Sequence, residues 1–181
     1  MSIGFKEWSL VCEALGRGRQ CILLRKGGIA EEGGQFRFKY SEFFLYPTFF
    51  HQQKEKTKIL PDFNEPVPSV QNAGIRYFAK VRWVKRLVDL KMIKRLSPFH
   101  IWQESVIEER YRYRQTAYID LAFVEILQLS EIWRIQETPE IVGCKSWVPL
   151  PALPAEIGIY PIYKEENLKE FERQIVDIVG S

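Results

Sequence analysis

The segment from Tyr77 to Trp83 constrains the fold more than any other part of the chain, because its side chains alternate with a period of two. Tyr, Ala, Val and Trp occupy the odd positions, and Lys80 and Arg82 lie at even ones. This is the pattern of a β-strand with one buried face and one polar face. A second long strand is predicted over residues 117–129, where apolar side chains also recur at every other position.

Helices and shorter strands are predicted around these two long strands. Three helices are predicted over residues 5–15, 90–96 and 164–179. A fourth is predicted to begin near Phe49, with Thr48 as its N-cap. A fifth is predicted to begin at Ser97-Pro98 and to direct Trp102 into the core. The predicted short strands cover residues 21–24, 36–39 and 43–46. The proline-rich residues 61–74 and the passage from Trp147 to Pro151 are expected to be irregular.

This order of elements predicts one α+β domain over residues 1–181. Its sheet is expected to be mainly antiparallel and curled, in the direction of a small barrel, with helices on its flanks. The composition agrees with a folded domain, because 46% of the residues are hydrophobic and 27% are charged. Aromatic residues reach 14%, which indicates a core or a binding face rich in rings.

The same composition excludes several classes of protein. No apolar run approaches the ~18 residues of a membrane span, and the N-terminal residues lack the layout of a signal peptide. The three cysteines form no C-x-x-C pair, so neither a zinc site nor a disulfide framework is predicted. We therefore expect a bacterial, cytoplasmic protein without a metal site, a membrane contact or a cofactor. The net charge of +3 is too small to indicate a partner by itself.

Basic residues concentrate in one part of the chain. Eight of the 26 lysines and arginines lie between positions 76 and 95, where Asp89 is the one acid. Such a run, interleaved with rings, predicts contacts with a phosphate backbone. The residues expected to make them are Lys80, Arg82, Lys85 and Arg86. The alternative is that these cations form cross-strand ion pairs with Asp120 and Glu125 of the next long strand.

Arg25-Lys26-Gly27-Gly28 follows a short apolar run that is predicted to be a buried strand. Two glycines allow consecutive backbone N–H groups to face one point, and the two cations add positive charge, so the segment predicts an anion pocket. In a nucleic-acid-binding protein that anion is a phosphate. The alternative is an ordinary turn whose Arg25 and Lys26 side chains are solvated.

His51 is the candidate acid or base of the segment Tyr-Pro-Thr-Phe-Phe-His-Gln at residues 46–52. It lies about one helical turn after Thr48, and Glu31 or Glu32 could orient it if the intervening chain brings them together. The alternative is a structural histidine. A pocket for a base is predicted from Gly27, Gly28, Tyr46, Thr48, His51, Gln52 and Trp102.

Several short segments together resemble one family. They are Gly4 to Trp8, Leu23 to Ile29 with Glu31-Glu32, Tyr46-Pro47-Thr48, Phe50-His51-Gln52 and Phe99 to Trp102. The chain resembles the bacterial domain-of-unknown-function family 1802 over nearly its whole length. This resemblance implies a link to DNA handling or restriction–modification, because members are similar to regions found beside restriction-endonuclease-like domains. The order of strands is also similar to the small barrel of PUA-like and EVE-like modules, which cradle a nucleotide.

Three functions follow from these patterns. The first is a non-enzymatic module that binds DNA or RNA through the basic residues and the ring-lined pocket. The second is a Mg²⁺-dependent enzyme that cleaves phosphodiesters or processes nucleotides, with His51 or His100 as acid or base and Glu31, Glu32 or Asp89 as carboxylates. The third is a protein-interaction module with a ring-rich interface. The oligomeric state is left open by the sequence.

Overall fold

The computed structural model describes residues 1–26, 37–49, 53–58, 73–136, 138–143 and 145–180. Seven strands in this part of the chain form one sheet in the order β2-β5-β4-β3-β1-β6, with β7 also paired to β5. The strands are β1 (Ser2–Trp8), β2 (Ile22–Arg25), β3 (Glu42–Thr48), β4 (Ala73–Leu87), β5 (Ile119–Ile135), β6 (Trp147–Leu150) and β7 (Ile159–Pro161). All neighbours are antiparallel except β1 and β3. The predicted α+β class with a mainly antiparallel sheet is confirmed.

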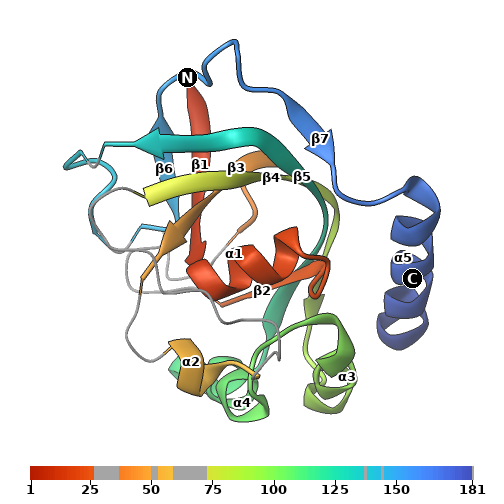
Figure 1. The fold of residues 1–181 in the computed structure, drawn as a ribbon. Coiled ribbons are helices and arrows are strands. Elements are labelled where there is room, and N and C mark those ends of the chain that lie inside the picture. The colour runs from red at the N-terminus through yellow and green to blue at the C-terminus, as the bar shows by residue number, and fades with distance from the viewer. Residues whose placement is uncertain (27–36, 50–52, 59–72, 137, 144, 181) are drawn as a thin grey trace.

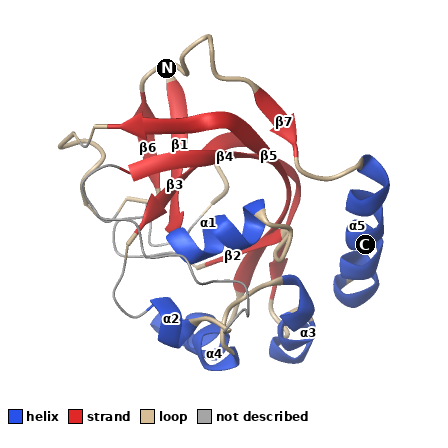
Figure 2. Cartoon of the chain, viewed as in Figure 1, coloured by secondary structure: helices blue, strands red, loops and turns tan. Residues whose placement is uncertain are grey.

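The sheet is strongly curled but open (Figure 2). Its longest pair, β4 and β5, runs antiparallel with register shifts between Ile75 and Tyr77 and between Val81 and Trp83. Bulges of this kind increase the local twist of a strand pair, which lets the ribbon bend. Within the described residues, β2 and β6 end the strand order without pairing with each other. The curl is therefore confirmed, whereas closure into a barrel is not observed.

Five α-helices accompany the sheet in the described residues (Figure 1): α1 (Ser9–Gly16), α2 (Gln53–Lys56), α3 (Leu90–Arg95), α4 (Glu104–Arg112) and α5 (Glu165–Val179). Helix α1 lies inside the curl, and its Val11 and Leu15 are fully buried. Gly16 ends this helix directly against Tyr77 of β4, where a Cβ atom would come within 2.0 Å of the tyrosine ring. Helices α2, α3 and α4 gather at one end of the sheet, and α5 packs beside it.

Two of the predicted helices are wrong in part. Residues 2–8 form a strand, and the helix predicted over residues 5–15 begins only at Ser9. The apolar spacing of Phe5 and Trp8 suits either conformation, and pairing with β3 on one side and β6 on the other decides for the strand. The helix predicted from Ser97 is a single 3₁₀ turn that ends at Phe99, and α4 starts after an extended passage.

Other local predictions also differ from the structure. Residues 37–40 have no regular structure, although a strand was predicted over 36–39. Trp147–Leu150 forms the edge strand β6, where an irregular passage was predicted. Thr48 is the last residue of β3, and its hydroxyl donates to the carbonyl oxygen of Glu7 at 3.0 Å. The strands predicted at 21–24 and 43–46 and the helices at 90–96 and 164–179 are observed with small changes of bounds. The strands predicted at 77–83 and 117–129 are observed but are longer, because β4 extends at both ends and β5 runs on to Ile135.

None of the helices in the described part of the chain combines the length and the apolar character that crossing a membrane requires.

Candidate nucleic-acid interface

Three charged side chains lie in a row across β2, β5 and β4. Asp120 of β5 is in register with Arg25 of β2 on one side and with Arg86 of β4 on the other. Side chains at directly opposite positions of antiparallel strands point to the same face of the sheet. One face of the sheet therefore carries a cation, an anion and a cation side by side.

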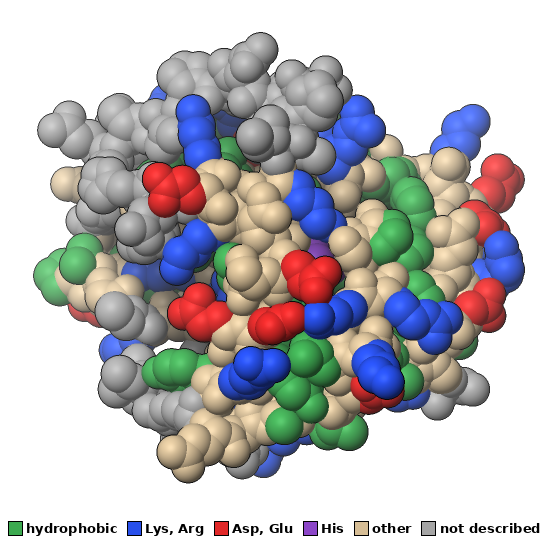
Figure 3. Space-filling model, turned by 90° about the horizontal axis from the view of Figure 1, so that it is seen from below, with side chains coloured by type: hydrophobic (Ala, Val, Ile, Leu, Met, Phe, Trp, Pro, Cys, Tyr) green, Lys and Arg blue, Asp and Glu red, His purple; other side chains and the backbone are tan. Residues whose placement is uncertain are grey.

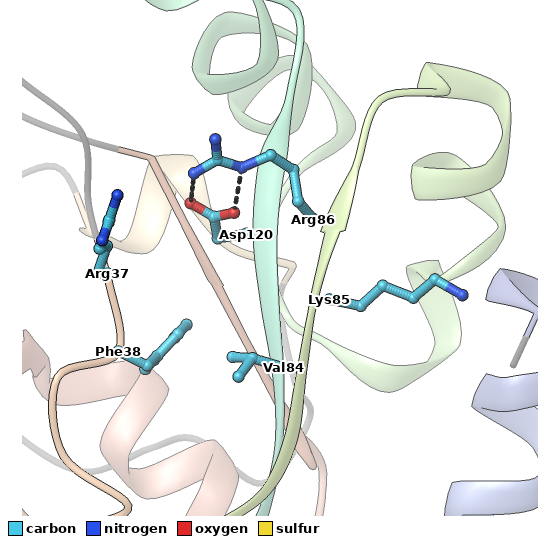
Figure 4. Close-up of a pocket in the computed structure, with 6 residues that line it drawn as sticks. All are labelled: Arg37, Phe38, Val84, Lys85, Arg86 and Asp120. Carbon is cyan, nitrogen blue, oxygen red and sulfur yellow. Dashed lines mark hydrogen bonds and ion pairs between the residues drawn. The ribbon is translucent and has the colours of Figure 1, made fainter.

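Two hydrogen bonds fix Arg86 against Asp120 (Figure 4). Nε of Arg86 donates to Oδ1 at 2.7 Å, and Nη2 donates to Oδ2 at 2.9 Å. These bonds raise the pKa of Arg86 above its usual value. A guanidinium has five N–H donors, so three remain available for a ligand. The Arg86 side chain is 41% exposed, which places these donors at the surface.

A hollow of ≈ 240 Å³ lies beside this pair, and we call it the cationic hollow. Its lining residues are Arg37, Phe38, Val84, Lys85, Arg86 and Asp120 (Figure 4). Phe38 and Val84 supply an apolar floor, and Arg37 stands near the Arg86–Asp120 pair. The Lys85 side chain extends away from the hollow, and its Nζ donates to the carbonyl oxygen of Gly180 at 2.8 Å.

Tyr118 holds two cations beside the cationic hollow. Nζ of Lys26 lies 4.3 Å from the centre of the tyrosine ring, and Cζ of Arg86 lies 4.0 Å from it. Both distances are in the range of cation–π attraction. Lys26 also donates to the carbonyl oxygens of Tyr111 and Thr116. Burial lowers the pKa of Lys26. Lys26 is therefore held in place by the protein, and its charge adds to the local field.

Among the described residues, cations outnumber acids around the cationic hollow. Arg37, Arg86 and Lys26 lie near one described acid, Asp120, which leaves a formal excess of two positive charges in this part of the chain. No acid in the described part of the chain lies within ion-pair distance of the exposed Arg37. This excess, together with the apolar floor, is what an anion that also carries a flat apolar group requires.

Arg25 connects the charged row to the buried Glu7. Nη1 of Arg25 lies 3.6 Å from Oε2 of Glu7, whose side chain is 1% exposed. Nη2 of Arg25 donates to Oγ of Ser146 at 2.9 Å, and its Cζ lies 4.9 Å from the centre of the Phe5 ring. The charge of Arg25 is thus paired with Glu7.

A second group of rings and cations contains two buried side chains, Trp102 and His100, and two half-buried ones, Trp8 and Arg110. We call these four residues the sealed cluster. The Trp8 and Trp102 ring centres are 4.7 Å apart, and Trp102 is 1% exposed. Cζ of Arg110 lies 3.8 Å from the Trp102 ring centre. Burial lowers the pKa of Arg110 to about 10, with the nearby Arg25 adding to the effect and Glu7 opposing it.

His100, a candidate acid or base, lies inside the sealed cluster and is 4% exposed. Its Nδ1 accepts a hydrogen bond from the backbone N–H of Trp102 at 3.1 Å, which assigns the ring proton to Nε2 in the neutral form. Burial, followed by the charges of Lys58 and Arg110, lowers its pKa to about 3. The histidine is therefore neutral at physiological pH and sealed from solvent.

Two other basic residues of the predicted strand, Lys80 and Arg82, form ion pairs with acids. Lys80 lies 3.6 Å from Glu42, and Arg82 lies 3.1 Å from Glu125 and 2.9 Å from Glu165. The alternative that cations of this strand pair with Asp120 and Glu125 is observed for two of them: Arg86 pairs with Asp120, and Arg82 pairs with Glu125. On the face that Figure 3 shows, acidic side chains likewise lie among the basic ones. No continuous basic stripe follows β4 along the described residues.

The remaining predicted site residues divide into two groups. Gly27, Gly28, Glu31, Glu32, His51 and Gln52 lie outside the described residues. Tyr46 is buried and Thr48 is half-buried, both at the end of β3. Asp89 caps helix α3, where its carboxylate accepts from the backbone N–H of Lys91 at 2.8 Å. Among the described residues, no three His, Cys, Asp or Glu side chains gather closely enough to hold a metal ion.

Sequence reasoning missed the part that residues 37 and 38 play. The alternation of Phe and basic residues there was a usable signal, although it predicted a strand. The structure instead brings Phe38 to 6.0 Å from the Phe5 ring, and so places Arg37 across the cationic hollow from the sheet. Asp120 was predicted only as an ion-pair partner. Its position between Arg25 and Arg86 depends on the pairing of β2, β5 and β4, and the register of these strands could not be predicted from the sequence.

Comparison with known proteins gives one family match. The family model described as "Domain of unknown function (DUF1802)" matches residues 4–174. No curated protein matches the sequence.

Two crystal structures of the ASCH protein from Zymomonas mobilis are similar in shape. One, of a mutant, has a TM-score of 0.43 at 11% identity and covers 94% of each chain. The other has a TM-score of 0.42 at 11% identity, over 94% of this chain and 93% of that one.

Proposed function

The chain belongs to the family of domains of unknown function DUF1802, and we propose that it binds nucleic acid, without catalysis, at the cationic hollow. One observation carries this proposal. Arg37 and Arg86 face the same ring-floored hollow, in which Asp120 is the acid that lines it. The proposed binding site is therefore smaller than the one predicted from the sequence, because it is the cationic hollow and not the whole basic strand.

The chemistry of the hollow suits a nucleotide unit. Guanidinium groups bind phosphate oxygens through paired N–H donors, and Arg37 and Arg86 present two such groups at the surface. Phe38 and Val84 offer an apolar floor on which a base or a sugar can lie. Base–aromatic stacking is worth about 1–3 kcal/mol per base. A base must leave a duplex to reach such a floor, so the proposed ligand is a single strand.

Three of the predicted nucleic-acid-binding residues belong to this interface. Arg86 contacts phosphate directly, Lys26 adds positive charge from beside Tyr118, and Arg25 joins the end of β2 to Glu7 of β1. Arg37 is added to them. Lys80 and Arg82 lie outside the interface, because acids already hold their charged groups. Lys85 lines the hollow, but its side chain extends away from it and its Nζ donates to the carbonyl oxygen of Gly180.

We do not propose an enzymatic function. Of the two histidines in the chain, His100 is sealed in the core, and His51 lies outside the described residues together with Glu31 and Glu32. The link to DNA handling or restriction–modification and the protein-interaction alternative both stay predictions from the sequence.

A salt-dependent binding titration tests the proposal. Labelled single-stranded DNA and RNA of about twelve nucleotides are titrated at about 50 and 200 mM salt, with fluorescence anisotropy as the readout. If about three phosphates are contacted, the logarithm of the association constant falls with the logarithm of the salt concentration with a slope of about −2. The absence of binding by either strand at the lower salt concentration would overturn the proposal.

A pair of charge-reversal variants locates the binding site. Arg37→Glu changes an exposed residue at the hollow and is expected to weaken binding at least about tenfold. Lys169→Glu makes the same kind of change on an exposed position of α5 and is expected to weaken it less than about twofold. Equal effects of the two variants would show that overall charge, and not the hollow, determines affinity.

A further inference from the structure

We propose that the cationic hollow recognises the terminal phosphate of a nucleic-acid strand, and not a phosphodiester in its interior. This inference rests on the proposed function and names the part of the ligand that the hollow binds. It follows from three properties of the site: the orientation of Arg86, the local excess of positive charge and the size of the hollow.

The orientation of Arg86 is set before any ligand arrives. Asp120 accepts from Nε and Nη2 of Arg86 at 2.7 and 2.9 Å, so one edge of the guanidinium is already used. The Nη1 group and the second hydrogen on Nη2 point away from Asp120. Arg37 stands near this pair and adds a second guanidinium (Figure 4). Arg37 and Arg86 come from different elements and line the same hollow, so we infer that both guanidinium groups bind free oxygens of one phosphate.

Asp120 acts here as a positioning residue. It lies in register between Arg25 and Arg86, and its side chain is 12% exposed. A carboxylate at this place lowers the net charge of the hollow, but it also fixes the direction of the Arg86 donors. Fixing donors in advance reduces the entropy that is lost when a ligand binds.

The charge of the hollow matches a dianion. Counted over the described residues, Arg37, Arg86 and Lys26 exceed Asp120 by two charges, whereas Arg25 is paired with Glu7 at 3.6 Å. A phosphomonoester carries about −1.5 to −2 charges at pH 7 and has three free oxygens. An internal phosphodiester carries one negative charge and has two free oxygens, so it leaves part of this positive field without a partner.

The size of the hollow favours the end of a strand. Its volume of ≈ 240 Å³ is below the roughly 300–1,000 Å³ of pockets that enclose whole small ligands. One side is formed by the β4–β5 row that carries Arg86 and Asp120, and the other by Arg37, above the floor of Phe38 and Val84. A terminal phosphate with its sugar fits between these walls, and the rest of the strand then leaves on one side.

The test compares three single strands of identical sequence. One carries a 5′-phosphate, one carries a 3′-phosphate, and one ends in hydroxyl groups on both sides. We expect at least one phosphorylated strand to bind about tenfold more tightly than the hydroxyl-ended strand. The two phosphorylated strands distinguish which end is recognised.

Variants at Arg37 locate that preference. In Arg37→Ala the tenfold preference is expected to fall below about twofold, and in Arg37→Lys to be retained in part, because lysine keeps the charge but loses the fork. Lys169→Ala, on the exposed face of α5, serves as the matched control and is expected to keep the full preference. Arg37 is exposed, so its variants are expected to fold like the parent protein.

The outcomes separate this inference from the proposed function. Equal affinity for all three strands overturns the terminal-phosphate inference and leaves nucleic-acid binding intact. A preference that survives in Arg37→Ala also overturns it, because the phosphate is then bound elsewhere. Failure of all three strands to bind at low salt overturns both proposals.

Discussion

The cationic hollow and the sealed cluster contain the same kinds of side chain, but the arginines of the hollow are exposed at the surface and the side chains of the cluster are packed against other parts of the protein. Each places a guanidinium against an aromatic ring: Arg86 lies 4.0 Å from the centre of Tyr118, and Arg110 lies 3.8 Å from the centre of Trp102. In the hollow, Arg86 stays 41% exposed and keeps free donors. In the cluster, Trp102 is 1% exposed, and Arg110 donates to the carbonyl oxygen of Leu24 at 3.1 Å.

The difference shows that a ring beside a cation is not by itself a binding site. Burial removes water from the sealed cluster and lowers the pKa values of Arg110 and His100, so the protein uses these groups to hold its own elements together. The hollow keeps Arg37 and Arg86 in contact with solvent, and among the described residues its cations exceed its acids. Perturbing the sealed cluster should therefore change stability, whereas perturbing the hollow should change binding.

The largest effect on stability is expected from Trp102→Ala. Trp102 is fully buried against Trp8 and Arg110, so its removal leaves a large cavity and is expected to lower the free energy of unfolding by about 3–5 kcal/mol. Urea denaturation followed by circular dichroism measures this change. Tyr160→Ala, at a ring that is 61% exposed, is the control and is expected to cost less than about 1 kcal/mol. Similar losses in both variants would contradict the burial of the cluster.

Acid should weaken the fold through His100. The pKa of this histidine is about 3 in the folded state and 6.5 in its ordinary state, so the unfolded chain binds the proton first. Stability that is present at neutral pH is therefore lost as the pH falls below 6.5, by about 2 kcal/mol between pH 7 and pH 5. Urea denaturation at several pH values measures this loss.

The variant His100→Asn separates this effect from other titrations. An asparagine oxygen can replace Nδ1 as acceptor for the backbone N–H of Trp102, and it does not titrate. The variant is expected to be less stable at pH 7 but to lose little more stability down to pH 5. An unchanged pH dependence in this variant would show that His100 is not the group responsible.

The two carboxylates that pair with β4 should differ in importance. Asp120 supports Arg86 and lies in register with Arg25, so Asp120→Asn is expected to lower the free energy of unfolding by about 1–3 kcal/mol. Glu125→Gln leaves Arg82 with its second partner, Glu165, and is expected to cost less than about 1 kcal/mol. Thermal unfolding ranks the two variants, and the reverse order would contradict the role given to Asp120.

The smallest effect is expected at Lys80. This side chain is 42% exposed and pairs with Glu42, which is 57% exposed, so Lys80→Ala is expected to change stability by less than about 0.5 kcal/mol. Because the residue lies outside the cationic hollow, strand affinity should change by less than about twofold. A loss of affinity as large as that of Arg37→Ala would extend the interface along β4.

The long strands could be predicted from the sequence because period-two alternation is a local property. It identified the centres of β4 and β5, and it offered Asp120 and Glu125 as possible cross-strand partners of the basic residues in β4. Strand β1 could not be predicted in this way. Phe5 and Trp8 fit a helical stripe equally well, and pairing with β3 and β6, which are distant in sequence, decides its conformation.

The candidate site was predictable in part for the same reason. Arg25, Lys26 and Arg86 were identified as local clusters of charge, and the structure brings them to one region of the sheet. Whether a basic side chain can bind a ligand depends on whether an acid from another element already pairs with it, as Glu165 of α5 pairs with Arg82. A local sequence pattern does not show such pairing. The position of Arg37 likewise depends on a contact between distant parts of the chain, because its neighbour Phe38 packs against Phe5 of β1.

The most direct test of nucleic-acid binding at the cationic hollow is NMR of the arginine Nε–H groups during titration with a single strand. Assignment by single-site variants identifies the signals of Arg37, Arg86, Arg82 and Arg173. We predict that Arg37 and Arg86 shift as the strand binds, while Arg82, held by Glu125 and Glu165, and Arg173, held by Glu170, stay in place. Shifts at Arg82 or Arg173 without shifts at Arg37 and Arg86 would contradict it.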